Sequence, residues 1–294
     1  MLERVEAFGM ELRGILVPLI TPFGLDREVA LDVLERLAHE VLDDGAAGLV
    51  ALGTTGEPGS LTPAEQENVV EVAARVARER DVPLIVGARP DLATRPGVTA
   101  ALSLVPPFVR PGEAGVVAHF EALAGSVPLV IYHVPYRTGQ ELSITTIRRL
   151  TSISGVIGMK YATGTIEVIG DLPDGFALLG GDDPLISPML ATGAHGGILA
   201  SAHIATRAFA DLAAAWQAGD VARARRLGGP LADLSRSLFA EPNPTVIKGV
   251  LEDQGRIPTS AVRLPLLPAA RSTVAAALSL CEALTSGVLD GPAR

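Results

Sequence analysis

The sequence predicts a closed barrel of eight parallel strands, the (β/α)8 or TIM-barrel fold, followed by a C-terminal helical extension. Eight short apolar runs alternate with longer segments whose apolar residues recur at helical spacing. The length of 294 residues suits one such barrel with an appendage. No Gly-x-Gly-x-x-Gly follows the first apolar run, which argues against the alternative, a doubly wound open sheet.

The predicted strands are short, apolar and bounded by turn residues, as buried parallel strands are. They are expected at Gly14–Ile20, Gly48–Leu52, Pro83–Gly87, Leu102–Val105, Pro128–His133, Val156–Lys160, Phe176–Leu179 and Gly197–Ala200. Helices are expected between them at Glu28–Leu42, Thr62–Arg80, Gly112–Ala124 and Ser143–Ser152.

Two places along this pattern carry further information. Thr62, Pro63 and Glu65 are typical of a helix start, with a capping threonine, proline at the first position and glutamate at the third. Only 14 residues separate Gly87 from Leu102, and prolines occupy part of them, so this crossover should contain a very short or irregular helix. From about Ala205 onward only helical patterns follow. We therefore expect the barrel at residues 1–224 and the helical extension at 225–294.

Composition excludes several classes of protein. The net charge is −9 and no basic run occurs, which argues against a nucleic-acid partner. No apolar run reaches the ~18 residues of a membrane span. The first residues lack the form of a signal peptide, and the single cysteine, Cys281, cannot form an internal disulfide. We expect a cytoplasmic protein without a membrane partner.

Lys160 is the first candidate catalytic residue. The chain has 24 basic residues, of which only Lys160 and Lys248 are lysines. A lysine can lose its proton in a protein, whereas an arginine cannot. Lys160 ends an apolar run, where desolvation favours the neutral amine that attacks a carbonyl carbon. The same position also suits a lysine whose amine reaches water from the end of the strand.

Other polar residues follow the predicted strands, at the end where (β/α)8 barrels build their active sites. The second strand ends in Gly53–Glu57, whose hydroxyls and backbone N–H groups could hold a carboxylate; a helix-capping turn is the alternative. The fifth ends in Tyr132–Gly139 and the sixth in Lys160–Gly164. All three tyrosines of the chain lie in these last two segments, which favours function over packing, at least for Tyr132.

Five segments together resemble the successive signatures of the dihydrodipicolinate synthase / N-acetylneuraminate lyase family, in the order and at the spacing of that family. They are Gly53–Glu57, Tyr132–Gly139, Gly158–Gly164, Gly181–Asp183 and Glu241–Pro244. The resemblance implies a (β/α)8 enzyme with a helical C-terminal extension, commonly a tetramer. It also implies a Schiff base between a lysine and pyruvate or another 2-keto acid, with no metal and no organic cofactor.

The resemblance assigns the catalytic roles. Lys160 matches the Schiff-base lysine, and Tyr132 matches the tyrosine that carries protons during imine formation and carbon–carbon bond chemistry. Thr54 and Thr55 match the pair that binds the carboxylate of the keto acid, and Thr55 also belongs to the proton relay. A protonated imine is an electron sink that needs a positioned acid and base, which agrees with these assignments.

Two further residues receive binding roles from the resemblance. Arg137 matches the arginine that receives the carboxylate of the second substrate in dihydrodipicolinate synthases. Ile198 matches a residue whose backbone faces the bound substrate. The remaining candidates are weaker. His195, His203 and Asp182 lack the spacing of metal ligands, so no metal site is expected.

The chain departs from the family pattern at several points. Phe108 stands where the family has a tyrosine that completes the proton relay across a subunit interface, so the relay must be shortened or re-routed. Tyr161 follows the lysine where a carboxylate is more usual. The short crossover after Gly87, together with Pro63, Gln66 and Pro107, does not match the site at which free lysine inhibits feedback-regulated synthases.

We therefore expect a Schiff-base-forming lyase or aldolase that condenses pyruvate or a related 2-keto acid with an aldehyde, or releases it. Arg137 favours a carboxylate-bearing partner such as aspartate semialdehyde, which would make the protein an authentic 4-hydroxy-tetrahydrodipicolinate synthase. Phe108 favours a divergent enzyme that acts on another aldehyde or a deoxy keto sugar acid. A non-catalytic keto-acid-binding protein on the same scaffold is a further alternative. The expected assembly is a homo-oligomer, a dimer or a tetramer.

Overall fold

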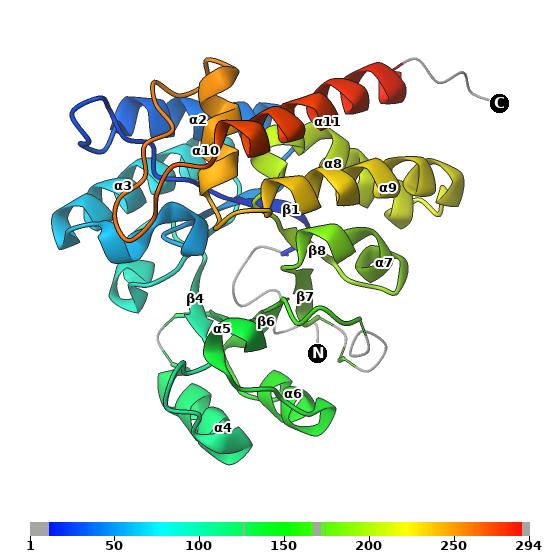
Figure 1. Ribbon diagram of the computed structural model, residues 1–294. Coiled ribbons are helices and arrows are strands. Elements are labelled where there is room, and N and C mark those ends of the chain that lie inside the picture. Colours follow the sequence, from blue (N-terminus) through cyan, green and yellow to red (C-terminus); the bar gives the residue numbers. More distant parts are fainter. Residues whose placement is uncertain (1–11, 126, 167–171, 174, 290–294) are drawn as a thin grey trace.

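The computed structural model describes residues 12–125, 127–166, 172–173 and 175–289, and it contains the predicted closed barrel (Figure 1). Eight parallel strands follow one another around the barrel in sequence order, and the last pairs with the first. They are β1 Gly14–Pro18, β2 Gly48–Ala51, β3 Leu84–Val86, β4 Ala100–Leu104, β5 Leu129–His133, β6 Val156–Tyr161, β7 Ala177–Gly180 and β8 Gly196–Ile198. The predicted fold class is confirmed, and each predicted strand overlaps an observed one.

Helices surround the barrel and connect its strands. They are α2 Leu31–Asp43, α3 Pro63–Arg80, α4 Gly112–Leu123, α5 Pro135–Thr138, α6 Ile144–Thr151, α7 Ile186–Ala191 and α8 Ala202–Gln217. The crossover from β3 to β4 contains only a 3₁₀ turn at Pro90–Thr94, as its length and prolines predict. Helix α3 begins with the predicted capping box, in which Thr62 and Glu65 satisfy one another's backbone N–H groups.

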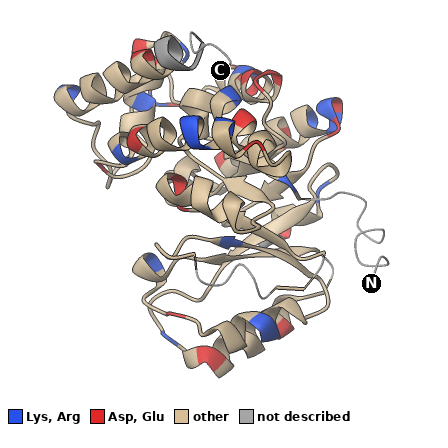
Figure 2. Ribbon diagram, turned by 90° about the vertical axis from the view of Figure 1, so that its right-hand side faces the viewer, with Lys and Arg blue, Asp and Glu red and all other residues tan. Residues whose placement is uncertain are grey.

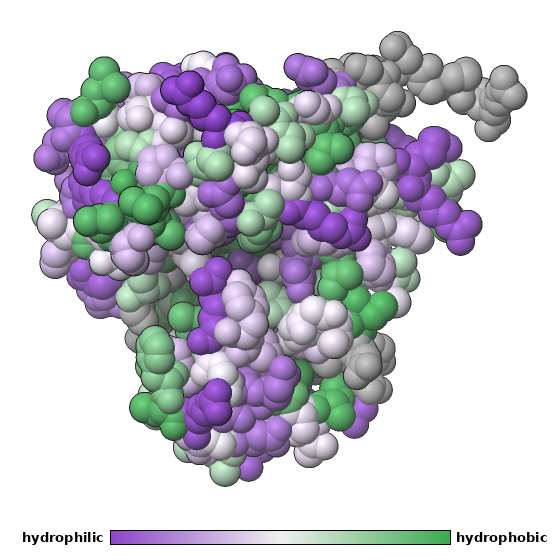
Figure 3. All heavy atoms as spheres, viewed as in Figure 1, coloured by the Kyte–Doolittle hydropathy of each residue, from purple (hydrophilic) through white to green (hydrophobic). Residues whose placement is uncertain are grey.

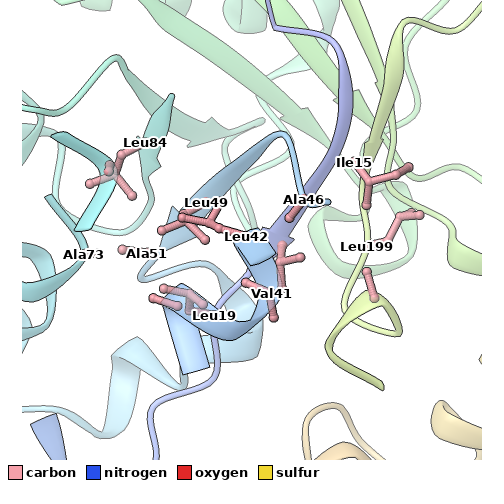
Figure 4. Packing of buried hydrophobic residues seen from close by; sticks show 14 of the residues in the cluster. Ile15, Leu19, Val41, Leu42, Ala46, Leu49, Ala51, Ala73, Leu84 and Leu199 are labelled. Atoms are coloured by element: carbon pink, nitrogen blue, oxygen red, sulfur yellow. The ribbon is translucent and has the colours of Figure 1, made fainter. Parts of the chain in front are cut away.

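Alternation along the strands produces two apolar layers. Val130 and Tyr132 of β5 point into the barrel interior, with Leu16, Val50 and Leu179, whereas Ile131 packs outward against the helices. The outer layer buries small aliphatic side chains, which suits a chain with only 4% aromatic residues. Figure 4 shows part of it, where Leu49 and Ala51 of β2 meet Val41 and Leu42 of α2 and Ala73 of α3.

Three further helices follow α8: α9 Val221–Leu238, α10 Thr245–Asp253 and α11 Arg271–Leu289. Helix α9 packs against α8, and α11 packs against α9 and α10, so the extension covers one side of the barrel (Figure 1). The boundary predicted after residue 224 lies within α9. In the described part of the chain no helix is long and apolar enough to cross a membrane.

Charged residues of both signs are interspersed over the outer helices on the face shown in Figure 2. This distribution agrees with the acidic net charge and differs from the basic stripe of a nucleic-acid-binding face.

Candidate active site

Lys160 lies on β6, inside the carboxyl end of the barrel, between Tyr132 of β5 and Leu179 of β7. Only 8% of its surface is exposed. Gly181 makes room for its stem, because a Cβ at that position would stand 2.7 Å from Cε of Lys160. The glycine after β7 thus belongs to the architecture of the lysine site.

Tyr132 is the direct neighbour of Lys160 in the sheet register. The Nζ atom of Lys160 lies 4.5 Å from the centroid of the Tyr132 ring. Tyr132 is 7% exposed, and both side chains line the same pocket. A buried amine beside a phenol is an arrangement suited to imine formation, since the phenol can exchange a proton with the carbinolamine oxygen.

Thr54 and Thr55 form a 3₁₀ turn directly after β2 and also line this pocket. Thr55 is buried, and its Oγ1 accepts a hydrogen bond of 3.0 Å from Nδ2 of Asn243. Because that bond occupies an acceptor position, the hydroxyl proton of Thr55 remains available for donation into the pocket. Asn243 comes from the C-terminal extension, so the extension completes the site.

The rim of the pocket is formed by the short helix α5. Arg137 and Tyr136 of α5 both line the pocket, and Nε of Arg137 donates a hydrogen bond of 2.7 Å to the Tyr136 hydroxyl. Asp182, which follows β7, also lines the pocket. The rim therefore offers a cation and an anion around the buried amine.

The pocket has a volume of about 360 Å³, enough for two small organic acids. It brings together Lys160, Tyr132, Thr54, Thr55 and Arg137. Two other candidates lie elsewhere. Ile198 packs in the barrel interior, and Ala200 rather than Ile198 lines the pocket. Phe108 lies on the loop after β4 and is 90% exposed.

Asp183 adds a buried carboxyl group that sequence reasoning did not single out. Burial raises its pKa to about 6, and the backbone N–H of Ser201, 2.7 Å from Oδ2, opposes this shift. Asp183 lines the pocket and interacts electrostatically with Lys160. The carboxyl group is thus poised to change its charge near the amine in mildly acidic solution.

A second, larger cavity of about 650 Å³ lies on the other side of Tyr132 and Thr54. Its lining is mainly apolar, with Leu52, Leu102 and Pro107 among its residues. Lys160 lines the smaller pocket and does not line this larger one, which adjoins it at Tyr132 and Thr54.

Lys248, the second lysine of the chain, is completely buried. Its amine forms an ion pair with Glu57 and donates a hydrogen bond of 2.9 Å to the carbonyl oxygen of Ala261. The amine also lies 4.1 Å from the centroid of the Phe23 ring. Burial lowers the pKa of Lys248 to about 8, against the opposing effect of Glu57. No pattern in the sequence indicates that Glu57 and Lys248 pair. The ion pair between Glu57 and Lys248 links helix α10 to the turn that contains Thr54 and Thr55.

The histidines do not form a metal site. His133 packs outward against Tyr161, as alternation predicts, and burial lowers its pKa to about 4. His203 accepts a hydrogen bond from the backbone N–H of Ile20, and burial lowers its pKa to about 3. Across the described residues, no cluster of three histidine, cysteine, aspartate or glutamate side chains could hold a metal ion.

Comparison with known proteins agrees with this geometry. Residues 11–283 match the dihydrodipicolinate synthetase family. The 4-hydroxy-tetrahydrodipicolinate synthase of Laribacter hongkongensis is 38% identical over 286 residues, which are 91% of this chain and 98% of that protein.

Solved structures lead to the same family. The 4-hydroxy-tetrahydrodipicolinate synthase of Methylacidiphilum fumariolicum superposes with a TM-score of 0.89 at 28% identity, covering 95% of this chain and 99% of the other. The dihydrodipicolinate synthase of Acinetobacter baumannii, solved with pyruvate, superposes with a TM-score of 0.86 at 33% identity, and the match covers 92% of this chain and 99% of the other. The chain therefore belongs to the dihydrodipicolinate synthetase family of pyruvate-dependent aldolases and lyases, which hold their substrate as a Schiff base on a lysine and use no cofactor.

Proposed function

We propose that the protein condenses pyruvate, bound as a Schiff base on Lys160, with an aldehyde that carries a carboxylate. Aspartate semialdehyde is the first candidate, which corresponds to 4-hydroxy-tetrahydrodipicolinate synthase activity. The observation that carries this proposal is the buried amine of Lys160 against Tyr132, in a pocket whose rim holds Arg137. Relatives that share 36–38% of their residues with this chain bear that name.

In this proposal the neutral amine of Lys160 attacks C2 of pyruvate, and the carbonyl oxygen leaves as water after two proton transfers. Tyr132 supplies and recovers those protons, and Thr54 and Thr55 hold the pyruvate carboxylate with N–H and O–H donors. Loss of a proton from C3 then gives the enamine. The enamine carbon attacks the aldehyde, the aldehyde oxygen takes up a proton, and the imine re-forms before ring closure or hydrolysis frees Lys160.

Arg137 supports the choice of a carboxylate-bearing aldehyde. Its guanidinium lies at the rim, where the second substrate enters, and it can receive a carboxylate through two N–H groups. Asp182, which lines the same pocket, can accept a hydrogen bond from an ammonium or hydroxyl group. A short aldehyde with a carboxylate at its other end and an ammonium group beside that carboxylate, as in aspartate semialdehyde, offers a partner to each of these two groups.

We further propose that the chain acts as a homo-oligomer in which the Phe108 loop packs against a second copy. Phe108 has a backbone φ of +69° and an almost fully exposed ring, and Val109 beside it is 73% exposed. Leu264 and Leu267 on the C-terminal segment are also exposed. Figure 3 shows apolar surface gathered into groups on the face drawn there. An exposed, strained aromatic residue is best explained by a partner that covers it.

Phe108 also favours a second candidate function. If its ring reaches the larger cavity beside the partner's active site, it brings no hydroxyl to the relay. Such a site would be drier and would suit a less polar aldehyde than aspartate semialdehyde. In that case the enzyme would be a divergent aldolase or dehydratase of the same family.

A condensation assay separates the two candidates. The purified oligomer is given pyruvate with aspartate semialdehyde or with a panel of uncharged aldehydes, and product formation is measured. The first proposal predicts turnover with aspartate semialdehyde on the order of 10 s⁻¹. Negligible turnover, together with efficient use of an uncharged aldehyde, would favour the second. In that second case Phe108→Tyr should raise the activity with aspartate semialdehyde.

A further inference from the structure

Tyr136 occupies an unusual position at the mouth of the pocket. Its residue surface is 74% exposed, yet its hydroxyl turns inward and accepts the Nε–H of Arg137 at 2.7 Å. The guanidinium carbon of Arg137 lies 4.9 Å from the Tyr136 ring centroid. The hydroxyl is also close enough to Tyr132 and Asp182 to interact with both electrostatically. An exposed ring with its hydroxyl turned into the mouth is placed to meet an incoming ligand.

The hydrogen bond determines which donors face the pocket. A guanidinium has five N–H donors, and Tyr136 occupies the one on Nε. Within the described residues, no oxygen accepts from the two terminal nitrogens of Arg137 and no carboxylate pairs with them. Those nitrogens carry four N–H groups in one plane, the arrangement that grips a carboxylate through two bonds.

The phenol contributes a donor of its own. A hydroxyl has one proton and two acceptor positions, so a phenol that accepts from Nε of Arg137 keeps its proton to donate. A carboxylate held by the terminal nitrogens of Arg137 would lie beside this proton. Tyr136 can therefore both orient the guanidinium and donate to the same ligand.

We propose that Tyr136 is a specificity-determining residue that selects an aldehyde substrate bearing a carboxylate. This inference rests on the proposed function, because it concerns the second substrate of that reaction. The phenol orients Arg137 and adds a third donor to the carboxylate, and its ring narrows the mouth against bulkier partners. Tyr136 has no part in binding pyruvate or in forming the imine.

The test compares two aldehydes of equal chain length. Succinic semialdehyde carries a carboxylate, and butanal does not. Tyr136→Phe keeps the ring and removes only the hydroxyl, and because the residue is exposed the variant should keep the fold. We expect the KM for succinic semialdehyde to rise about tenfold, since a hydrogen bond to a charged group is lost. The KM values for butanal and pyruvate should stay within about twofold.

Tyr161→Phe is the matched control. Tyr161 also loses a phenol hydroxyl in this variant, but its ring packs outward against His133, away from the pocket. In Tyr161→Phe the ratio of the KM for succinic semialdehyde to the KM for butanal should equal that of the wild type. The proposal would be overturned if Tyr136→Phe left this ratio of KM values unchanged, whether neither KM rises or both rise by the same factor.

A binding measurement separates this inference from the proposed function. Borohydride converts the pyruvate imine to a stable secondary amine, so the trapped enzyme cannot turn over. Calorimetry on the trapped enzyme should show succinic semialdehyde binding about tenfold more weakly to Tyr136→Phe than to the wild type. Failure of trapping in the wild type would refute the Schiff-base function. Successful trapping with equal affinities for the aldehyde would refute the role of Tyr136 alone.

Discussion

The buried ion pair between Lys248 and Glu57 allows a quantitative prediction. In Lys248→Met the Glu57 carboxylate would remain buried, with one hydrogen bond of 3.1 Å from the backbone N–H of Arg263. Removing one partner of a buried pair costs about 3–5 kcal/mol. The carboxylate can escape this cost only by taking up a proton. For a glutamate with a reference pKa near 4.3, that uptake costs about 3.7 kcal/mol at pH 7 and about 1 kcal/mol at pH 5.

We therefore expect Lys248→Met to lose about 4 kcal/mol of unfolding free energy at pH 7. The unfolding entropy of a 294-residue chain is about 0.6 kcal/mol per kelvin, so Tm should fall by about 6 °C. The deficit relative to wild type should shrink as the pH is lowered to 5, because protonation becomes cheaper. Urea and thermal unfolding at both pH values measure these quantities.

The double variant Glu57→Gln/Lys248→Met is the matched control. It removes the buried charge together with its partner, so it should recover part of the stability that the single variant loses. The KM for pyruvate should rise in the single variant, since Glu57 anchors the turn of Thr54 and Thr55. A loss below about 1 kcal/mol at pH 7, or a deficit that does not depend on pH, would refute this reasoning.

Three further outcomes are expected. Tyr132→Phe should slow turnover by about 10²–10⁴-fold while pyruvate affinity changes little, because a general acid–base group is lost; a fall of less than about tenfold in kcat would contradict its role. Free lysine at millimolar concentration should neither bind nor inhibit, because Gln66, at a position of the family's lysine-inhibition site, already has its amide hydrogen-bonded to Pro58 and Arg89. Saturable lysine binding in calorimetry would refute this. The free energy of unfolding should fall by about 3 kcal/mol between pH 7.5 and pH 5. The lowered pKa values of His133 and His203 give stability that is complete above pH 6.5 and is lost as the pH falls toward 4 and 3. The raised pKa of Asp183 partly offsets this loss. Urea unfolding at the two pH values tests this, with His203→Gln as a variant in which the loss should be about a quarter as large, because the offset from Asp183 then cancels most of the contribution of His133.

The sequence predicts the barrel and the centre of the site because both depend on local patterns. Strand alternation places Tyr132 and Lys160 inside the barrel and His133 and Tyr161 outside it. The carboxyl ends of parallel strands converge, which brings Thr54 to the same pocket.

The contacts between distant segments could not be predicted in this way. The pair of Glu57 and Lys248 joins residues 191 positions apart, and the bond from Asn243 to Thr55 spans 188. Both depend on how helix α10 and the segment before it dock onto the barrel, which no periodicity encodes. The inward turn of the Tyr136 hydroxyl depends on a side-chain rotamer on the short helix α5, and alternation does not determine it.

The most direct test of the account is the site of Schiff-base formation. The protein is incubated with pyruvate and borohydride and digested, and the modified peptide is identified by mass spectrometry. The reduced pyruvyl group should be found on Lys160 and not on Lys248, the only other lysine of the chain. Lys160→Arg should fold normally and show neither labelling nor turnover, since arginine forms no imine at neutral pH. Labelling of Lys248, or none in the wild type, would contradict the account.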